Sequence, residues 1–595
     1  MPTESHPSSV VSFTPSVANL QRLIRVALGE EAGDRLLTGG QVVNVFTGRV
    51  QPANVVIADG CIAGVGPFDW TARETIDVRG RAVLPGLIDS HMHLESTLLT
   101  PAELTRLIVP HGTTATISDS HEVGNVLGVP GIELLIAASA GLPFDLFFVA
   151  SSCVPAANWE HSGAVLGPAE VRQLLAHPRV LGLAEMMDVP AILRGDATAL
   201  EKVQAALACG RAVDGHAPAM CGRDLMAYIA AGIRSDHESG TLEEARAKAA
   251  WGMLVQVREG SIARNLDTLL PLLVASELGD DWTLVTDDIL PVDLREHGHI
   301  DGLLRRVVAA GVPPAVAVRH ASLTPARHYG LTDRGAVAPG YRADLVVVDD
   351  LRDFRPHLVI KDGQVVARDA AFVGELSARS IPCGNTIHLP PLDESGFRLH
   401  LSSPTCPVIR IQLGSLVTRR ETRQVAMEAG LWRWDAARDV LMIASIERHK
   451  ALGCVGLGLV AGFGIERPGA LGSSVAHDSH NIILAGTNAR DMLACARALA
   501  ESGGGFVVAS DGEVRALLPL PLAGLLSLES FETVCRRLED VDRAARTLGC
   551  SVPCPFGVLS FLALSVIPEL RITDQGLWDV MEQRFVRLGS QGRVG

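Results

Sequence analysis

Between residues 83 and 332, short apolar runs alternate with helix-like segments at near-regular spacing. The apolar runs predict eight strands, which end near His93, Asp119, Val154, Glu185, His216, His237, Glu259 and Asp287. Helical patterns fill the gaps, for example at 101–109, 132–140, 197–208, 224–231, 242–250 and 262–276. Eight such units predict an α/β fold of the TIM type, a (β/α)8 barrel over residues 83–332. An open doubly wound sheet is the alternative, but no Gly-x-Gly-x-x-Gly motif follows a strand to support it.

Two β-rich segments flank this central block. Their alternating runs lie at 40–45, 54–58, 340–349 and 359–366. Asp-Gly pairs beside these runs indicate hairpin turns. We therefore expect one small composite β-domain, built from residues 34–82 and 333–380 on either side of the barrel.

The two ends of the chain have different patterns. Residues 1–33 form a predicted N-terminal helical segment, in which the side chains Leu20, Ile24 and Leu28 share one side of an amphipathic helix at 17–31. Residues 381–595 predict a separate C-terminal α+β domain. Its predicted strands and helices lie at 408–416, 440–446, 491–501, 506–509 and 528–548.

A glycine-rich stretch, Gly453–Gly472, lies inside this last domain. It has neither the spacing nor the Lys-Ser/Thr ending of a phosphate-binding loop. Glycine also adopts the conformations that tight turns require. The stretch is therefore predicted to form tight turns.

Composition excludes several classes of partner. The formal net charge is −15 and no long Lys/Arg block offsets it, which argues against nucleic acid. The eleven cysteines are scattered without a Cys-x-x-Cys pair, as in reduced cytoplasmic proteins. Residues 1–16 lack a signal-peptide pattern, and the apolar stretch Val558–Ile567 is about half the length that spans a bilayer. We expect a cytoplasmic protein that binds neither nucleic acid nor membrane.

The first predicted barrel strand runs into alternating histidines, His91 and His93, after Pro85-Gly86. On an extended strand, positions two apart face the same side, so both imidazoles can bind one cation. Imidazole and carboxylate suit zinc, iron or manganese, and such a cation generates hydroxide from water near neutral pH. A lone His-x-His motif is more often structural. Further candidate ligands later in the chain are therefore needed to support a cation site.

Four candidate partners follow, each at the end of a predicted strand: Glu185, His216, His237 and Asp287. A carboxylate in the apolar run around Glu185 requires compensation, and no Lys or Arg neighbours it, so it is expected to bridge two cations. Asp287 is expected to be both a ligand and a proton carrier. The next residue, Asp288, is also suited to capping a helix. The sequence therefore predicts a two-metal hydrolase.

With these residues in place, the chain resembles the amidohydrolase superfamily. The resemblance rests on the opening segment at 84–93 and the closing segment at 335–345. Many two-metal relatives use a carboxylated Lys on the fourth strand, where this chain has Glu185. Within the superfamily the chain is similar to the bacterial-type adenine deaminases, from about Asp34 to near its C-terminus. The motifs that carry this similarity lie at 91–97, 118–126, 215–218, 235–238, 286–288 and 476–481.

The resemblance implies that adenine is hydrolysed to hypoxanthine and ammonia by a hydroxide that attacks purine C6. It implies two divalent cations, manganese or iron by preference, with zinc possible. It assigns one cation to His91, His93, Asp287 and bridging Glu185, and the other to His216, His237 and Glu185. Asp287 would accept the hydroxide proton and pass it toward the leaving amine.

Further residues are candidates around the purine. Proton donation to a ring nitrogen, or reading of the purine edge, falls to Glu238, Glu122 and His121, each of which could equally orient a ligand histidine. Predicted substrate contacts are Asp119, Ser120, His477, Asp478 and His480. The last three either reach the pocket from the C-terminal domain or form a solvated polar loop.

Two other functions remain open. A cyclic-amide hydrolase of the hydantoinase or dihydroorotase kind would use the same barrel, although the absence of the fourth-strand Lys argues against it. A non-catalytic scaffold would be expected to lose cation-binding residues, whereas this chain retains all six. We expect a small purine substrate and a homo-oligomer, most simply a dimer.

Overall fold

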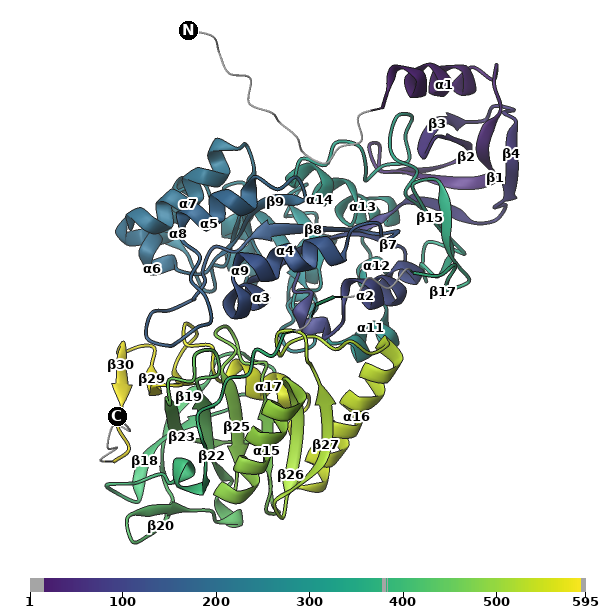
Figure 1. Ribbon diagram of the computed structural model, residues 1–595. Coiled ribbons are helices and arrows are strands. Elements are labelled where there is room, and N and C mark those ends of the chain that lie inside the picture. Colours follow the sequence, from purple (N-terminus) through teal and green to yellow (C-terminus); the bar gives the residue numbers. More distant parts are fainter. Residues whose placement is uncertain (1–14, 377–380, 383, 590–595) are drawn as a thin grey trace.

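A computed structural model describes residues 15–376, 381–382 and 384–589. Its centre is a barrel of parallel strands (Figure 1). These strands are β6 (Leu87–Met92), β7 (Thr113–Asp119), β8 (Asp145–Ala150), β9 (Val180–Met186), β10 (Ala212–Gly215), β11 (Ser235–Asp236), β12 (Leu254–Arg258) and β13 (Trp282–Val285). Backbone hydrogen bonds from Arg234 to Val213 (2.9 Å) and from Asp287 to His91 (3.0 Å) join the two sheets into a ring. The predicted barrel fold is confirmed.

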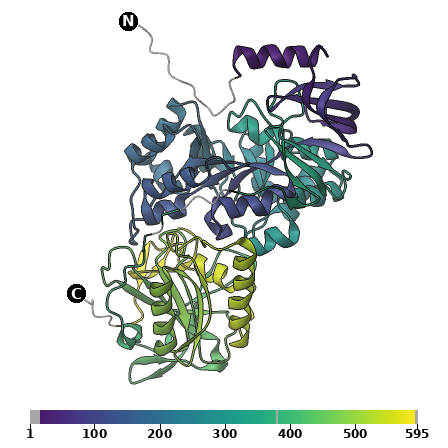
Figure 2. The same ribbon diagram turned by 45° about the vertical axis from the view of Figure 1, so that its right-hand side comes forward.

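Helices surround the barrel (Figure 2). They are α2 (Pro101–Ile108), α3 (His121–Leu127), α4 (Val129–Ala138), α5 (Pro168–Leu175), α6 (Val189–Arg194), α7 (Ala197–Ala208), α8 (Gly222–Ala230), α9 (Leu242–Ala249), α10 (Leu266–Val274), α11 (Pro291–His297), α12 (Ile300–Ala309), α13 (Pro314–His320) and α14 (Leu323–His328), with 3-10 turns η1 (Glu95–Thr97) and η2 (Val109–His111). On β8, Phe147 and Val149 belong to one cluster with Ile117 of β7 and Ile88 of β6, while Phe148 joins the larger core. Both faces of the strand are buried, which explains the continuous apolar runs.

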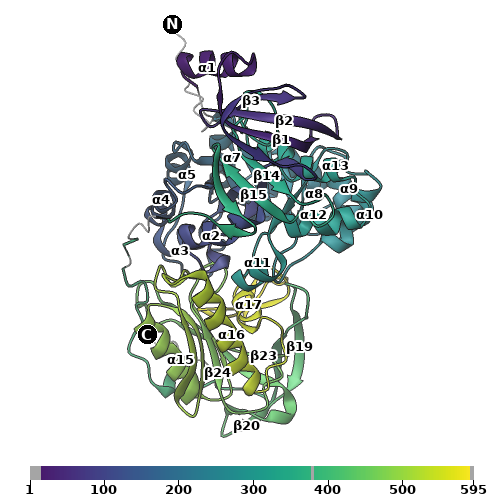
Figure 3. The same cartoon turned by 90° about the vertical axis from the view of Figure 1, so that its right-hand side faces the viewer.

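The two flanking β segments form one nine-stranded sheet (Figure 3). Its main path is β17-β16-β15-β14-β5-β1-β2-β3, and β4 pairs with β1. The strands are β1 (Gly33–Asn44), β2 (Arg49–Ala58), β3 (Cys61–Gly66), β4 (Ala72–Asp77), β5 (Ala82–Pro85), β14 (Leu345–Val348), β15 (Pro356–Lys361), β16 (Gln364–Arg368) and β17 (Ala371–Phe372). Antiparallel pairing of β5 with β14 joins the N-terminal and C-terminal halves. Asp362 and Gly363 both have positive φ between β15 and β16, as a two-residue hairpin turn requires.

Helix α1 (Val17–Ala27) packs on this sheet through a different side from the one the sequence suggested. Val26 is fully buried beside Leu36 and Trp70, and Leu23 packs against the same cluster. The predicted stripe of Leu20, Ile24 and Leu28 points to solvent. Leu23 and Val26 lie three apart and make the contact face, and a helix that packs on a sheet from outside buries only the face turned toward the sheet.

The C-terminal domain contains an eight-stranded sheet with the order β19-β18-β23-β22-β25-β24-β26-β27. Its strands are β18 (Thr405–Arg410), β19 (Arg419–Gln424), β22 (Val440–Ile446), β23 (Val455–Ala461), β24 (Ala470–Ser473), β25 (Ile482–Gly486), β26 (Gly505–Ser510) and β27 (Glu513–Pro519). The remaining elements are β20 (Ala426–Glu428), β21 (Leu431–Arg433), β28 (Leu570–Thr573), β29 (Gly576–Asp579), β30 (Arg584–Val586), α15 (Ala489–Ser502), α16 (Phe531–Thr547), α17 (Pro555–Phe561), η3 (Glu394–Phe397) and η4 (Ala436–Arg438).

The prediction of tight turns for Gly453–Gly472 is wrong over half of its length, because β23 and the start of β24 lie there. The glycines are needed for close packing between strands. A Cβ on Gly456 would lie 2.0 Å from the Thr573 carbonyl oxygen, and one on Gly458 would lie 2.6 Å from Leu577. Glycine inside a strand often marks such a close approach.

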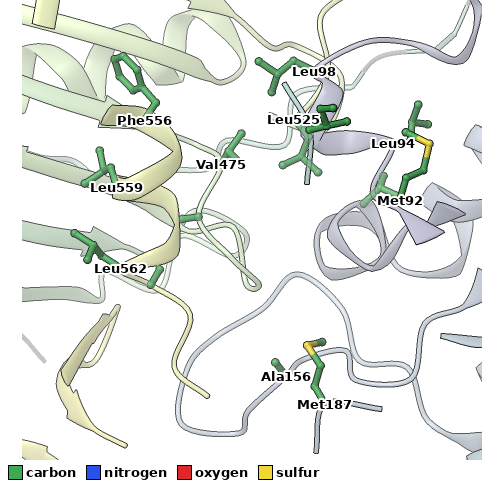
Figure 4. Close-up of a cluster of buried hydrophobic side chains, with 14 of the residues drawn as sticks. Met92, Leu94, Leu98, Ala156, Met187, Val475, Leu525, Phe556, Leu559 and Leu562 are labelled. Carbon is green, nitrogen blue, oxygen red and sulfur yellow. The ribbon is translucent and has the colours of Figure 1, made fainter. Parts of the chain in front are cut away.

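The C-terminal domain lies against the barrel (Figure 1). The Ser527 amide donates a hydrogen bond to the Leu98 carbonyl at 2.8 Å, and Arg295 pairs with Glu539 at 2.6 Å. Figure 4 shows Leu525 beside Leu98 at this boundary. Among the described helices, none has the length and apolarity to span a bilayer.

Candidate active site

Six buried side chains meet at the rim of the barrel: His91, His93, Glu185, His216, His237 and Asp287. Each lies at the end of a parallel strand or within two residues of it, on β6, β9, β10, β11 and β13. The carboxyl ends of barrel strands share one face, so residues far apart in sequence become neighbours there. The structure therefore brings together the six residues that the sequence predicted as cation ligands.

Glu185 is at the centre of this group. Its Oε2 lies 2.7 Å from His216 Nδ1 and 3.2 Å from His237 Nε2. Its other oxygen, Oε1, lies 3.6 Å from His93 Nε2. One carboxylate thus faces histidines on both of its oxygens, as a group bridging two cations would.

Asp287 faces the two histidines of β6. Its Oδ1 lies 3.2 Å from His91 Nε2 and 3.0 Å from His93 Nε2. Its φ of 58° lies in the left-handed region, which aspartate adopts more readily than most residues. This backbone turn directly after β13 brings the carboxylate to the His91–His93 strand.

Both carboxylates are ionised. Burial favours the neutral form of Glu185, but His237 and His216 outweigh it and hold its pKa well below the usual value. Burial likewise acts against ionisation of Asp287, and Arg258 with the nearby histidines holds that pKa well below the usual value. Ionised carboxylates are the form that binds a cation.

The donor set fits divalent cations. His91, His93 and Asp287 each place a ligand atom within 4.8 Å of the others, and His91, Glu185 and His237 form a second such group. Within the described part of the chain, Nδ1 of the buried His237 has no hydrogen-bond partner. Neutral nitrogen and anionic oxygen donors at this spacing suit zinc, manganese or iron.

Arg258 also belongs to the site, although the sequence did not single it out. Its guanidinium donates hydrogen bonds to Asp287 Oδ2 at 2.8 Å and to Glu238 Oε1. Burial disfavours the charge on Glu238, but Arg258 and the histidines lower its pKa. The available signal was an arginine closing the apolar run of β12, where a buried charge requires a partner.

A second polar cluster lies between the barrel and the C-terminal domain. The barrel supplies Asp119, Ser120, His121 and Glu122, and the C-terminal domain supplies His477, Asp478 and His480. All seven side chains are buried. The alternative of a solvated polar loop for His477, Asp478 and His480 is therefore wrong.

Three further residues belong to this region: Glu95 and Ser96, to which the sequence assigned no role, and Asp288, which it suggested only as a helix cap. The Ser96 hydroxyl lies 3.2 Å from Glu122 Oε1 and 2.5 Å from Asp288 Oδ1. Asp288 therefore bonds to Ser96 and does not cap helix α11. Burial, together with the Glu95 and Asp288 carboxylates, raises the pKa of Glu122 well above its usual value. This shift favours the protonated form of Glu122.

An apolar cavity lies beside this cluster, between the two domains. Its lining includes Ser96, Asp288 and His477 with Phe556 and Phe561. The His477 ring stacks on Phe561, with centroids 4.3 Å apart and an interplanar angle of 17°. Flat aromatic walls beside polar groups are typical of sites for small aromatic ligands.

Sequence similarity to known proteins extends over nearly the whole chain. Residues 82–366 match the amidohydrolase family, and residues 415–584 match the adenine deaminase C-terminal domain. An adenine deaminase of Kosmotoga olearia is 41% identical over 580 residues, which cover 96% of this chain and 100% of the relative. An adenine deaminase of Methanothrix thermoacetophila is 43% identical over 571 residues, covering 96% and 99%. Among solved structures, a D-hydantoinase has a TM-score of 0.45 at 17% identity and covers 57% of this chain and 96% of its own. This chain belongs to the adenine deaminase family of amidohydrolases.

Proposed function

We propose that the protein hydrolyses adenine to hypoxanthine and ammonia. The observation that carries the proposal is similarity along nearly the whole chain: relatives named adenine deaminase are 41% and 43% identical over 96% of it. The convergence of four imidazoles and two carboxylates at the barrel rim supports it. The complete donor set argues against the alternative of a non-catalytic scaffold, which would be expected to lose ligands.

The barrel residues divide into two ligand groups around Glu185. His91, His93 and Asp287 would hold one divalent cation, and His216 and His237 the other, with Glu185 between them. When bound, such cations lower the pKa of coordinated water and make hydroxide available near neutral pH. Burial of all six side chains keeps bulk water from competing for these groups.

Asp287 is the proposed proton carrier. Arg258 binds Oδ2 of Asp287, which leaves Oδ1 facing His91 and His93. From this position Asp287 Oδ1 takes the proton of the attacking water and passes it toward the leaving amine. Arg258 positions the carboxylate without exchanging a proton, because a guanidinium stays charged.

Addition at purine C6 places negative charge on the ring, which a proton at a ring nitrogen neutralises. Glu122 is the favoured proton donor among the predicted groups, because burial and the carboxylates of Glu95 and Asp288 raise its pKa and favour the protonated form. Glu238, which Arg258 keeps ionised, is better suited to accepting a hydrogen bond from the substrate. Asp119 and Ser120 remain predicted purine contacts.

Several finer assignments belong to the same proposal. They are manganese or iron as the native cation, zinc as the alternative, a role in purine salvage or adenine catabolism, a homodimer, the absence of a nucleic-acid partner, a cytoplasmic location and the domain boundaries predicted from the sequence. The net charge of −15 supports the absence of a nucleic-acid partner, because proteins that bind nucleic acid usually carry a basic surface.

The test is a substrate panel with the purified protein and added manganese. Adenine, adenosine, guanine, cytosine and a hydantoin are supplied in turn, and released ammonia and the ring product are measured. Adenine should yield ammonia and hypoxanthine with a kcat/KM of at least about 10⁴ M⁻¹s⁻¹. Hydantoin opening without ammonia release from adenine would instead establish the cyclic-amide hydrolase.

A further inference from the structure

Three side chains at the boundary between the domains converge on one point beside the six-residue pocket, where His121 Nδ1 lies 3.9 Å from Glu185 Oε1. His121 begins helix α3 of the barrel, whereas His477 and Asp478 lie in the C-terminal domain between β24 and β25. Each places a ligand atom within 4.8 Å of the other two. Asp478 Oδ1 lies 3.5 Å from His121 Nε2 and 3.8 Å from His477 Nδ1.

Two of these three residues, His121 and Asp478, have buried polar atoms without a hydrogen bond to any described part of the chain. His121, His477 and Asp478 are 4%, 6% and 2% exposed. In the described residues, neither ring nitrogen of His121 nor Oδ2 of Asp478 has a hydrogen-bond partner. Buried polar atoms without partners are rare, and an unseen ion is one of their established explanations.

The surroundings of His121 favour ligation through Nε2. Its Nδ1 lies 3.2 Å from Asp119 Oδ2, so the proton of a neutral ring belongs on that side. Nε2 then keeps its lone pair toward Asp478 and His477. A carboxylate behind the second nitrogen is the usual arrangement of a metal-binding histidine.

His480, the third histidine of the boundary, lacks this arrangement. The Ala476 amide donates a hydrogen bond to its Nδ1 at 3.2 Å, so Nδ1 is an acceptor and Nε2 carries the proton. A protonated nitrogen has no lone pair for a cation. His480 therefore serves as a matched control inside the same loop.

We propose that His121, His477 and Asp478 bind a third divalent cation, of the zinc, manganese or iron class, between the barrel and the C-terminal domain. Ligand bonds of about 2.0–2.2 Å in tetrahedral geometry separate the donor atoms by about 3.3–3.5 Å. The two separations from Asp478 Oδ1, 3.5 and 3.8 Å, need only a small contraction, and the ligand nitrogens of His121 and His477 lie within 4.8 Å of each other. Three protein ligands leave a fourth position open.

The cation would act as a link between the two domains. It attaches the loop that carries His477 and Asp478 to helix α3, whose His121 ring lies 4.9 Å from the His93 ring. The loop would then be held beside the predicted adenine pocket. Loss of this cation should loosen the domain boundary without removing the ligands of the six-residue pocket.

The experiment measures cations per protomer by inductively coupled plasma mass spectrometry after dialysis. Wild type and His480→Gln should each retain three ions. His477→Phe preserves the ring stack on Phe561 but removes the nitrogen, and Asp478→Asn keeps the side-chain shape; each should retain two. In a Glu185→Gln background, which weakens the six-residue pocket, one ion should persist and then disappear when Asp478→Asn is added.

Thermal unfolding gives a second measurement that does not depend on activity. A chelator titration should lower the Tm of the Glu185→Gln protein but leave the Glu185→Gln, Asp478→Asn double variant unchanged. Two ions in wild type, or equal ion content in wild type, His477→Phe and Asp478→Asn, would overturn the proposal. His121 would then be a protonated imidazolium paired with Asp119 and Asp478. Adenine deamination by a two-ion protein would leave the proposed function intact.

Discussion

Arg258 Nη1 lies 2.8 Å from Asp287 Oδ2, and the same guanidinium also binds Glu238. The buried guanidinium of Arg258 therefore orients two carboxylates that border the six-residue pocket. Asp287 uses its remaining oxygen to face His91 and His93. The position of the proposed proton carrier consequently depends on Arg258, which is not one of the six predicted ligands.

Replacing Arg258 by Met should lower kcat for adenine by about 100-fold, because misplacing a proton carrier removes much of its contribution. KM should change less. Arg258→Lys should recover part of kcat, since it keeps the charge but loses the forked geometry. Steady-state kinetics on samples with matched cation content check this. A rise in KM alone would show that Arg258 binds the substrate instead.

Glu185→Gln should lower cation content and reduce adenine deamination by at least about 1,000-fold. The amide keeps the size of the side chain but loses the anionic oxygens that face His216, His237 and His93. Glu201→Gln, at an exposed position on helix α7, is the control and should behave as wild type. Full activity in Glu185→Gln would refute the ligand assignment.

Asp542 predicts a pH dependence of stability. Burial raises its pKa to about 6, against an ordinary 3.8, although Arg546 opposes the shift. The folded protein therefore binds more protons than the unfolded chain between these values, and stability falls as the pH rises from about 4 to 6. Asp542→Asn should remove this loss and raise stability at pH 7 by about 1–2 kcal/mol, after allowance for partial exposure.

Thermal unfolding of both proteins at pH 4.5 and pH 7.5 measures this effect. The variant should gain several degrees in Tm at the higher pH and much less at the lower one. An equal gain in Tm at both pH values would mean that the ionised carboxylate of Asp542 does not cause the loss of stability in the wild type.

Gly456→Ala should destabilise the C-terminal domain by at least about 3 kcal/mol, since overpacking against rigid backbone forces a shift. Its new Cβ would lie 2.0 Å from the Thr573 oxygen and 2.6 Å from the Gly576 nitrogen. Gly396→Ala is the control, because its Cβ would meet only Leu392 at 3.7 Å. Urea unfolding of both variants compares them. Equal midpoints would show that β23 can move away from β28 and β29.

The six-residue pocket could be predicted from the sequence because each ligand ends an apolar strand. In a parallel barrel, the polar side chains at these strand ends all lie at the same rim. Arg258 was harder to assign, since a charge at the end of an apolar run also marks an ordinary strand end. Only the distances to Asp287 and Glu238 reveal its role.

The boundary between the domains was the part that sequence patterns described least well. Whether His477 and Asp478 are solvated or buried depends on how two separately formed units dock, and no local periodicity records that. The same limitation applies to Gly456, because the need for glycine arises from a strand more than a hundred residues away. The sequence also did not show which side of α1 is buried, because two faces of this helix carry apolar residues.

Pairing of β5 with β14 joins the last strand before the barrel-coding segment to the first sheet strand after it. During synthesis, β1 to β5 emerge first and must wait for more than two hundred further residues before their partner appears. The edge of β5 stays unsatisfied in that interval, and the His91 strand that follows it has no closed ring to join. A ribosome-bound chain ending before residue 345 should therefore be a strong client of chaperones, whereas one extended past residue 372 should release them.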